Sequence, residues 1–107
     1  EVVIKGLTAT EIDFISKKEK TSIGEVLDRL KSSGLKVLPG GGAEILDDRL
    51  RKEICPNKAN SNRWLKIMQK AHEAGLKSNA TMLFGHIETE KHRAKHLHKL
   101  RKLQEKT

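Results

Sequence analysis

Three consecutive glycines, Gly40 to Gly42, constrain the fold of this chain more than any other feature. They follow a short apolar run that ends at Pro39, and a helix-like segment is expected to open at Ala43 and Glu44. Adjacent glycines lose much backbone entropy on folding, so they indicate positive φ angles or a close approach of the backbone to another group. The pattern predicts a strand-to-helix turn, either a plain one or one whose N–H groups face a polar ligand. The GxGxxG and Gly-Lys-Ser/Thr fingerprints of nucleotide sites are absent.

Two further apolar runs predict strands, one over Val2 to Ile4 and one over Ala80 to Phe84. Helical patterns separate the three runs. Strands that alternate with helices predict an α/β fold with parallel strands and right-handed crossovers. We therefore expect three consecutive βα units in a single domain over residues 1–107.

The helices are marked by their first residues and by their apolar stripes. Thr89 and either Asn60 or Ser61 are placed as N-caps of the last two helices. Trp64 and Met68 share one helical face and are expected in the core.

Each predicted strand is followed by a turn and then by a Glu that enters the next helix: Glu11, Glu44 and Glu88. Parallel strands place such turns at the carboxyl-terminal edge of the sheet, where α/β folds bind ligands. The carboxylates therefore either line one mouth or stabilise helix dipoles, each by typically about 0.3–1 kcal/mol. His86 lies in the third turn and would face the same mouth as a titrating or hydrogen-bonding group.

Glu88, His92 and His96 recur at four-residue steps, which could present one helix face to a metal. The HExxH motif is absent, and basic residues alternate with these side chains, so we expect an exposed outer face instead. Cys55 is the only cysteine and has no second Cys or His near it in sequence, so we expect it to be structural. No metal site is predicted.

The chain carries 22 Lys and Arg against 14 Asp and Glu, a net charge of +8. The basic residues are mixed with acids on the helices, and only Phe14, Trp64 and Phe84 could stack on bases. We expect a solvated outer face and no nucleic-acid partner. No apolar run approaches the roughly 20 residues that span a bilayer, so no membrane partner and a cytoplasmic location are expected.

Three segments resemble the aminofutalosine synthases, radical S-adenosylmethionine enzymes of the futalosine route to menaquinone. They are Leu-Thr-Ala-Thr-Glu-Ile at 7–12, Pro-Gly-Gly-Gly-Ala-Glu-Ile at 39–45, and Ser-Asn-Ala-Thr-Met-Leu-Phe-Gly-His-Ile-Glu at 78–88. Further matches in order and approximate spacing extend the resemblance over essentially the whole chain. Dehypoxanthine futalosine cyclase and deazaflavin (FO) synthase are close relatives, and the third segment favours the synthase.

The resemblance implies part of a βα (TIM-like) barrel that binds S-adenosylmethionine and a [4Fe-4S] cluster and acts on a small molecule. The implied reaction adds a 5′-deoxyadenosyl radical to 3-[(1-carboxyvinyl)oxy]benzoate. The family's CxxxCxxC cluster motif is missing, because Cys55 stands alone. We therefore expect an internal fragment of the barrel, without the cluster ligands and inactive by itself.

The resemblance also implies roles by position. The implied cofactor-binding residues are Thr8, Thr10, Glu11, Gly40, Gly41, Gly42 and Glu44; Thr81 and His86 would bind substrate, and His86 and Glu88 would be catalytic. Exposed sheet edges and inward side chains such as Val3, Val37 and Met82 predict a homo-oligomer. The competing class is a non-enzymatic α/β binding module that uses the glycine turn and the basic helices.

Overall fold

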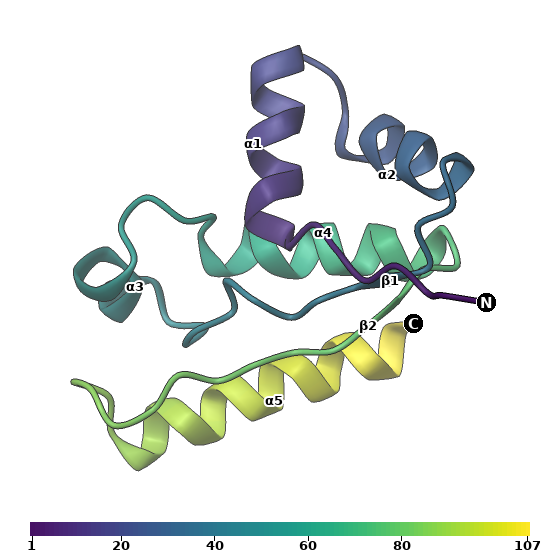
Figure 1. The fold of residues 1–107 in the computed structure, drawn as a ribbon. Helices are drawn as coiled ribbons and strands as arrows, with labels where there is room; N and C mark the ends of the chain where they lie inside the picture. The colour runs from purple at the N-terminus through teal and green to yellow at the C-terminus, as the bar shows by residue number, and fades with distance from the viewer.

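The computed structural model describes residues 1–107, which form five helices and two short strands (Figure 1). The helices are α1 (Ala9–Glu19), α2 (Ile23–Ser32), α3 (Asp48–Ile54), α4 (Ser61–Glu73) and α5 (Glu90–Lys106), and the strands are β1 (Val37–Leu38) and β2 (Lys77–Ser78). The strands pair in parallel, and Lys5 makes a further parallel bridge to Val37. The expected α/β class with parallel strands is confirmed.

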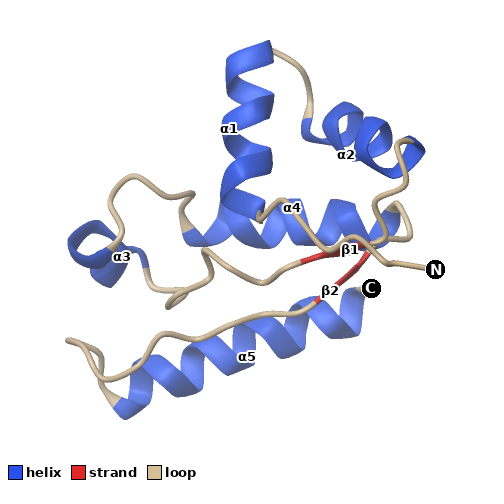
Figure 2. Cartoon of the chain, in the orientation of Figure 1, coloured by secondary structure: helices blue, strands red, loops and turns tan.

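Helix α4 is the centre of the packing, because it contacts α1, α2, α5 and β2. In the view of Figure 2, α1 and α2 lie above the strand pair and α5 lies below it, along the segment that follows β2. The caps expected at Asn60 and Thr89 are confirmed. No helix has both the length and the apolar character needed to cross a membrane.

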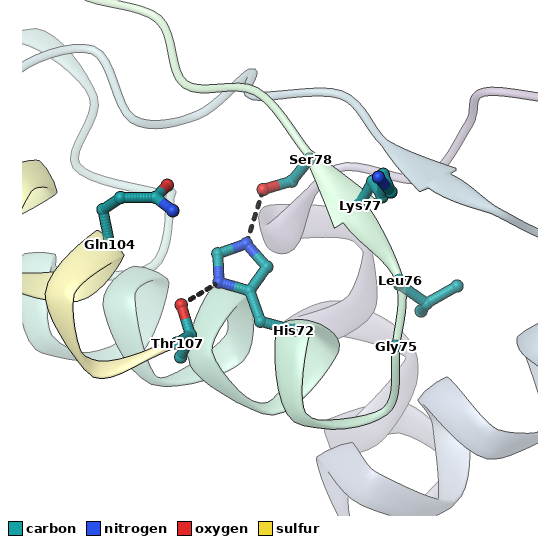
Figure 3. Close-up of a pocket in the computed structure, with 7 residues that line it drawn as sticks. All are labelled: His72, Gly75, Leu76, Lys77, Ser78, Gln104 and Thr107. Atoms are coloured by element: carbon teal, nitrogen blue, oxygen red, sulfur yellow. Dashed lines mark hydrogen bonds between the residues drawn. The ribbon is translucent and has the colours of Figure 1, made fainter.

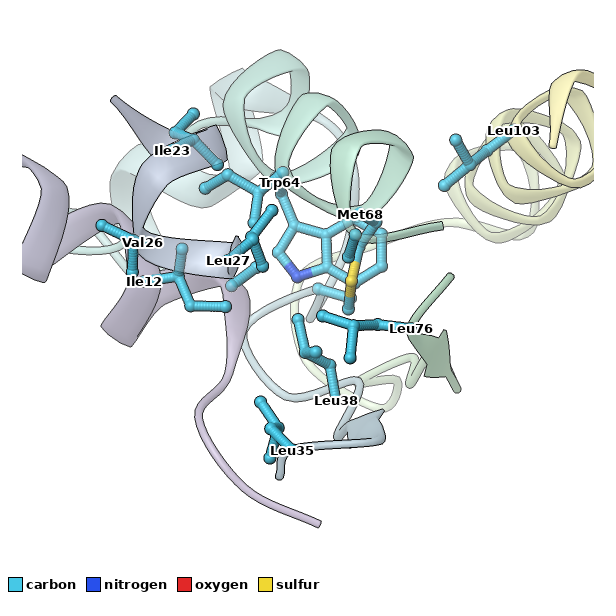
Figure 4. Packing of buried hydrophobic residues seen from close by; sticks show 14 of the residues in the cluster. Ile12, Ile23, Val26, Leu27, Leu35, Leu38, Trp64, Met68, Leu76 and Leu103 are labelled. Atoms are coloured by element: carbon cyan, nitrogen blue, oxygen red, sulfur yellow. The ribbon is translucent and has the colours of Figure 1, made fainter. Parts of the chain in front are cut away.

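The core forms between α4, the two N-terminal helices and β1 (Figure 4). Trp64 and Met68 are almost fully buried there, as the helical stripe predicts. Leu38 of β1 and Leu27 of α2 pack into the same cluster. Burial of a large apolar side chain stabilises a fold by about 1.5–3 kcal/mol, so these residues fix α1, α2 and α4 onto one side of the strands.

Two of the predicted strands are corrected by the structure. Residues Ala80 to Phe84 form no strand. The segment that pairs with β1 is β2, which lies earlier, at Lys77–Ser78. Val2 to Ile4 was expected to be a buried strand, yet Val2 is 90% exposed. This N-terminal segment pairs with β1 only through Lys5, so its apolar side chains remain in solvent.

The helix expected from Ala43 begins later, at Asp48. Asp47 is its N-cap, and the Asp47 carboxylate accepts hydrogen bonds from the N–H groups of Arg49 and Leu50, both at 3.1 Å. Glu44 therefore lies in an irregular segment with a positive φ of 44° and not at a helix start. The helix-dipole interpretation of Glu44 is wrong for this reason.

Candidate functional site

The turns that follow the N-terminal segment, β1 and β2 meet at the carboxyl ends of the parallel strands. We call residues 7–11, 39–47 and 79–88 the mouth loops. The Thr81 hydroxyl donates to the Gly40 carbonyl oxygen at 2.9 Å, which joins the second loop to the third. A Cβ atom on Gly42 would lie 2.5 Å from Thr10 Oγ1, which shows how closely the first and second loops pack. The expected convergence of these three turns is confirmed.

The glycines are required by this packing. Gly40 is buried, and a Cβ atom there would lie 2.5 Å from Ala80 Cα and closer still to the Asn79 carbonyl oxygen. Gly42 has a φ of +82°, a region that side chains disfavour. Both explanations offered by the sequence, positive φ and close approach, therefore hold within one turn.

Arg51 of α3 fixes the glycine turn by hydrogen bonds to its backbone, a role that the sequence did not predict. Its guanidinium is buried and donates to the carbonyl oxygens of Gly42 (2.9 Å), Ala43 (2.6 Å), Ile45 (3.2 Å) and Ala59 (3.1 Å from Nε). Each bond satisfies a buried acceptor that the irregular backbone leaves without a ladder partner. The burial of Arg51 could have been predicted from its position three residues before Ile54, on the apolar face of the helix.

The first mouth loop starts α1. The Thr8 hydroxyl accepts from the Glu11 N–H at 3.3 Å, and the Glu11 carboxylate accepts from the Thr8 N–H at 2.6 Å, which makes a capping box. Thr10 Oγ1 is buried against Gly42 and has no hydrogen-bond partner. A buried hydroxyl without a partner is costly unless a ligand or water supplies one, so Thr10 is a candidate contact for a polar ligand.

The carboxylate of Glu44 lies on the second loop and pairs with Lys58 Nζ at 3.0 Å. Its backbone carbonyl accepts from the Leu83 N–H at 2.7 Å, which adds a second link between the second and third loops. Glu44 thus contributes to the mouth through its backbone as well as its side chain.

The third loop closes on Glu88, whose side chain is only 1% exposed. Its carboxylate accepts from Arg93 Nη1 (2.9 Å) and from the N–H groups of Gly85 (3.1 Å) and His86 (3.0 Å). The Arg93 hydrogen bond, followed by those backbone bonds, lowers the pKa of Glu88 to about 2. Glu88 is therefore ionised and engaged at neutral pH.

His86 keeps one ring atom without a partner. Its Nε2–H donates to the Leu83 carbonyl oxygen at 2.9 Å, so Nδ1 is the bare acceptor of the ring. Nδ1 is buried without a hydrogen bond and lies 3.9 Å from the Glu88 carboxylate. Within this turn, the side-chain atom without a hydrogen-bond partner is therefore His86 Nδ1 and not an oxygen of Glu88.

His96 was expected on an exposed face, and that prediction is wrong. The side chain is fully buried between the second and third loops. Its Nδ1 accepts from the Leu46 N–H, and its Nε2 is bonded to the Thr81 carbonyl oxygen, both at 3.0 Å. Burial lowers the pKa of His96, although the bond to Thr81 raises it. The position could have been found from its spacing of four and seven residues before Leu100 and Leu103, the stripe that packs on the core.

A cavity of about 390 Å³ lies at the other end of β2, beside His72 (Figure 3). Thr107 donates its hydroxyl to the Leu103 carbonyl (3.1 Å), so it accepts from His72 Nδ1–H at 2.8 Å, and Ser78 Oγ then donates to Nε2 at 2.7 Å. Burial lowers the pKa of His72. Both ring nitrogens of His72 are therefore already partnered within the protein.

No group of three or more His, Cys, Asp or Glu side chains is arranged to hold a metal ion. Cys55 is buried at the end of α3, far short of the thiolates that an iron–sulfur cluster needs. The residues of this chain therefore do not fit a [4Fe-4S] cluster. In the mouth, Thr10 Oγ1 beside the glycine turn and His86 Nδ1 on the third loop are side-chain atoms without a hydrogen-bond partner.

Comparison with known proteins gives one family. The family model described as Radical SAM superfamily matches residues 7–100. The chain is 47% identical over 106 residues to the aminodeoxyfutalosine synthase of Thermus thermophilus, which covers 99% of this chain and 28% of that protein. It is 41% identical over 107 residues to the 5-amino-6-(D-ribitylamino)uracil--L-tyrosine 4-hydroxyphenyl transferase of Methanococcus maripaludis, which covers 100% of this chain and 30% of that protein. The chain thus spans less than a third of the length of these relatives.

Proposed function

The chain belongs to the radical SAM superfamily, and we propose on that basis that its mouth loops bind S-adenosylmethionine and the substrate of an aminofutalosine synthase. The observation that carries the proposal is the meeting of three loops at the carboxyl ends of parallel strands, with two polar atoms left unpartnered. The 47% identity to a protein named aminodeoxyfutalosine synthase supports the choice of family member.

We propose that residues 1–107 are one partial-barrel domain of a longer protein. The proposed reaction is that of the longer protein. It joins the 5′-deoxyadenosyl group to the double bond of 3-[(1-carboxyvinyl)oxy]benzoate, with loss of the carboxyl group, in menaquinone biosynthesis. S-adenosylmethionine would supply that group as a radical and release methionine, after one electron from the cluster of the longer protein reduces it. Because this chain lacks the cluster ligands, we propose that it is inactive alone and contributes one wall of the site.

We propose roles within the mouth by position, as the resemblance implies them. The proposed cofactor side comprises Thr8, Thr10, Glu11, Gly40, Gly41, Gly42 and Glu44, and the proposed substrate side comprises Thr81, His86 and Glu88. Thr10 Oγ1 is the polar contact on the cofactor side, and His86 Nδ1 accepts a hydrogen bond from the substrate. Glu88 holds the turn that orients His86, since its own oxygens are occupied by N–H groups and by Arg93.

The test is turnover by the protein expressed from its complete reading frame, with its cluster reconstituted. Three substrates are compared: 3-[(1-carboxyvinyl)oxy]benzoate, dehypoxanthine futalosine, and 5-amino-6-(D-ribitylamino)uracil with tyrosine. Turnover of the first alone supports the synthase. Turnover of only the second would replace it by the cyclase, and turnover of only the third by the aryl transferase activity that names the Methanococcus relative. A protein that turns over none and binds no S-adenosylmethionine would favour the non-enzymatic binding module.

A further inference from the structure

The second and third mouth loops are joined by direct hydrogen bonds and by one side chain from elsewhere. The direct bonds run from Thr81 Oγ1 to Gly40 O (2.9 Å) and from the Leu83 N–H to Glu44 O (2.7 Å). The additional link is the ring of His96, which comes from α5. The relative position of the two loops therefore depends on a residue that lies in neither.

The ring of His96 makes one bond to each loop. The Leu46 N–H can only donate, so Nδ1 is the acceptor, and the Thr81 carbonyl can only accept, so Nε2 carries the hydrogen. Both bonds are 3.0 Å long and the side chain has no exposed surface. The geometry thus requires the neutral Nε2–H form of the ring.

The charged groups around the ring favour the same form. Arg51 of α3 and Lys99 of α5 both act on His96 as positive charges, and Lys99 Nζ donates to the Leu46 carbonyl at 2.6 Å. The two acids that follow Leu46 in sequence have other partners, since Asp47 accepts from the Arg49 and Leu50 N–H groups at 3.1 Å and Asp48 accepts from the Ser61 N–H at 2.8 Å. An imidazolium at this position would be buried beside two cations and would lose the Leu46 bond.

We propose that His96 is a positioning residue: it sets the register between the glycine turn and the loop that carries Thr81 and His86. The ring satisfies a buried donor on the second loop and a partly buried acceptor on the third. A shift of the second loop would therefore leave the Leu46 N–H buried without a partner, and a shift of the third loop would break the bond to Thr81. The identity of the ligand that these loops bind rests on the proposed function. The relative position of the two loops does not.

Two substitutions each keep half of the link. In His96→Asn the amide oxygen can replace Nδ1 and accept from Leu46, and in His96→Gln the amide nitrogen can replace Nε2 and donate to Thr81. Amide hydrogen exchange is measured at Leu46 and Leu83 of the 107-residue chain. We expect His96→Gln to raise exchange at Leu46 by about tenfold with Leu83 near the wild-type rate, and His96→Asn to do the reverse.

The matched control is His98→Asn, an exposed histidine on the same helix, which should leave both amides unchanged. Exchange at the buried Ile67 of α4 reports global unfolding. Wild-type rates at Leu46 and Leu83 in both variants, or an equal rise at Ile67, would overturn the proposal. If neither variant folds, the ¹⁵N spectrum of the wild-type ring decides the matter, because an Nδ1–H form of His96 contradicts the proposed link.

Ligand binding by the same variants distinguishes the proposed function from the positioning role of His96. In the complete, cluster-loaded protein we expect His96→Asn and His96→Gln each to weaken S-adenosylmethionine or substrate binding by about tenfold, with His98→Asn unchanged. If the wild-type protein binds neither ligand, the proposed function fails, and the exchange measurement still decides the register.

Discussion

The hydroxyl of Thr81 donates a 2.9 Å hydrogen bond to the carbonyl oxygen of Gly40, although the two residues are 41 positions apart. The bond joins the turn after β1 to the loop after β2, at the end of the sheet where α/β folds bind ligands. It is possible because Gly40 has no side chain where the backbone of Asn79 and Ala80 passes. The glycine triplet and the third loop are therefore one structural unit.

We predict that Gly40→Ala destabilises the chain by about 1–3 kcal/mol or more, because the added methyl group meets backbone that cannot move aside cheaply. Gly24→Ala is the matched control. Gly24 lies inside α2, where the nearest atom to an added Cβ is Ser22 Oγ at 3.8 Å, so this change should stabilise by about 0.5–1 kcal/mol. Urea unfolding measures both, and equal effects of the two substitutions would refute the close approach at Gly40.

Replacement of Arg51 should be among the most damaging substitutions in the chain. Arg51→Met leaves the carbonyl oxygens of Gly42, Ala43 and Ile45 buried without donors, and we expect a loss of about 3 kcal/mol or more. Arg49→Met, on the exposed side of the same helix, should change stability by less than about 0.5 kcal/mol. A comparison of urea midpoints tests this, and similar midpoints for the two variants would show that Arg51 does not hold the turn.

Stability should fall as the solution is acidified below neutral pH. The pKa values of His72 and His96 are lowered by burial from 6.5, so the unfolded chain binds more protons than the folded one below that pH. The stabilisation is therefore complete above about pH 6.5 and is lost progressively toward the lower folded-state pKa values. Glu88, with a pKa of about 2, stays ionised throughout this window.

Urea unfolding at a series of pH values measures this loss. His72→Asn should reduce the slope below neutral pH, whereas His98→Asn should leave it unchanged, because the side chain of His98 is exposed to solvent in the folded chain. A free energy of unfolding that rises on acidification would contradict the assignment of buried neutral histidines.

We also predict self-association through the apolar surface that the strands leave open. Val3 is 54% exposed and its neighbour Ile4 65%, and exposed apolar surface of this kind marks interaction sites. Phe84, in the third mouth loop, is 69% exposed. Light scattering should give a mass above one chain that decreases with dilution. Ile4→Lys should lower it, whereas Leu97→Lys, at a leucine of α5 that is 55% exposed, should have a smaller effect. A monomer at every concentration would remove the homo-oligomer from the proposal.

Local features of this fold could be predicted from sequence because they depend on residues close together in the chain. Thr89 and Asn60 cap their helices through their own next turn, and Gly42 adopts a positive φ that favours glycine. The position of β2 could not be predicted, because the apolar run from Ala80 suggests a strand while the pairing partner of β1 is the polar pair Lys77 and Ser78. Register depends on the tertiary partner and not on the run itself.

The buried polar residues were the other failure. Arg51 and His96 each follow or precede a lysine, and only their helical spacing from Ile54 and from Leu100 and Leu103 points to burial. They are buried because the irregular second loop leaves carbonyl and N–H groups that only these side chains reach. Which backbone groups lack partners is a property of the assembled loops, so a list of residues cannot show it.

The most direct test of the shared mouth is a titration of the ¹⁵N-labelled chain with S-adenosylmethionine, followed by amide chemical shifts. We predict weak binding, with a dissociation constant on the order of 1 mM in the absence of a cluster. The shifted amides should gather in all three mouth loops, at Thr10, Gly42 and His86 among others, with Gly75 and Gln104 beside the His72 cavity unchanged. Shifts confined to that cavity, or none at saturating ligand, would show that these loops do not form the binding site.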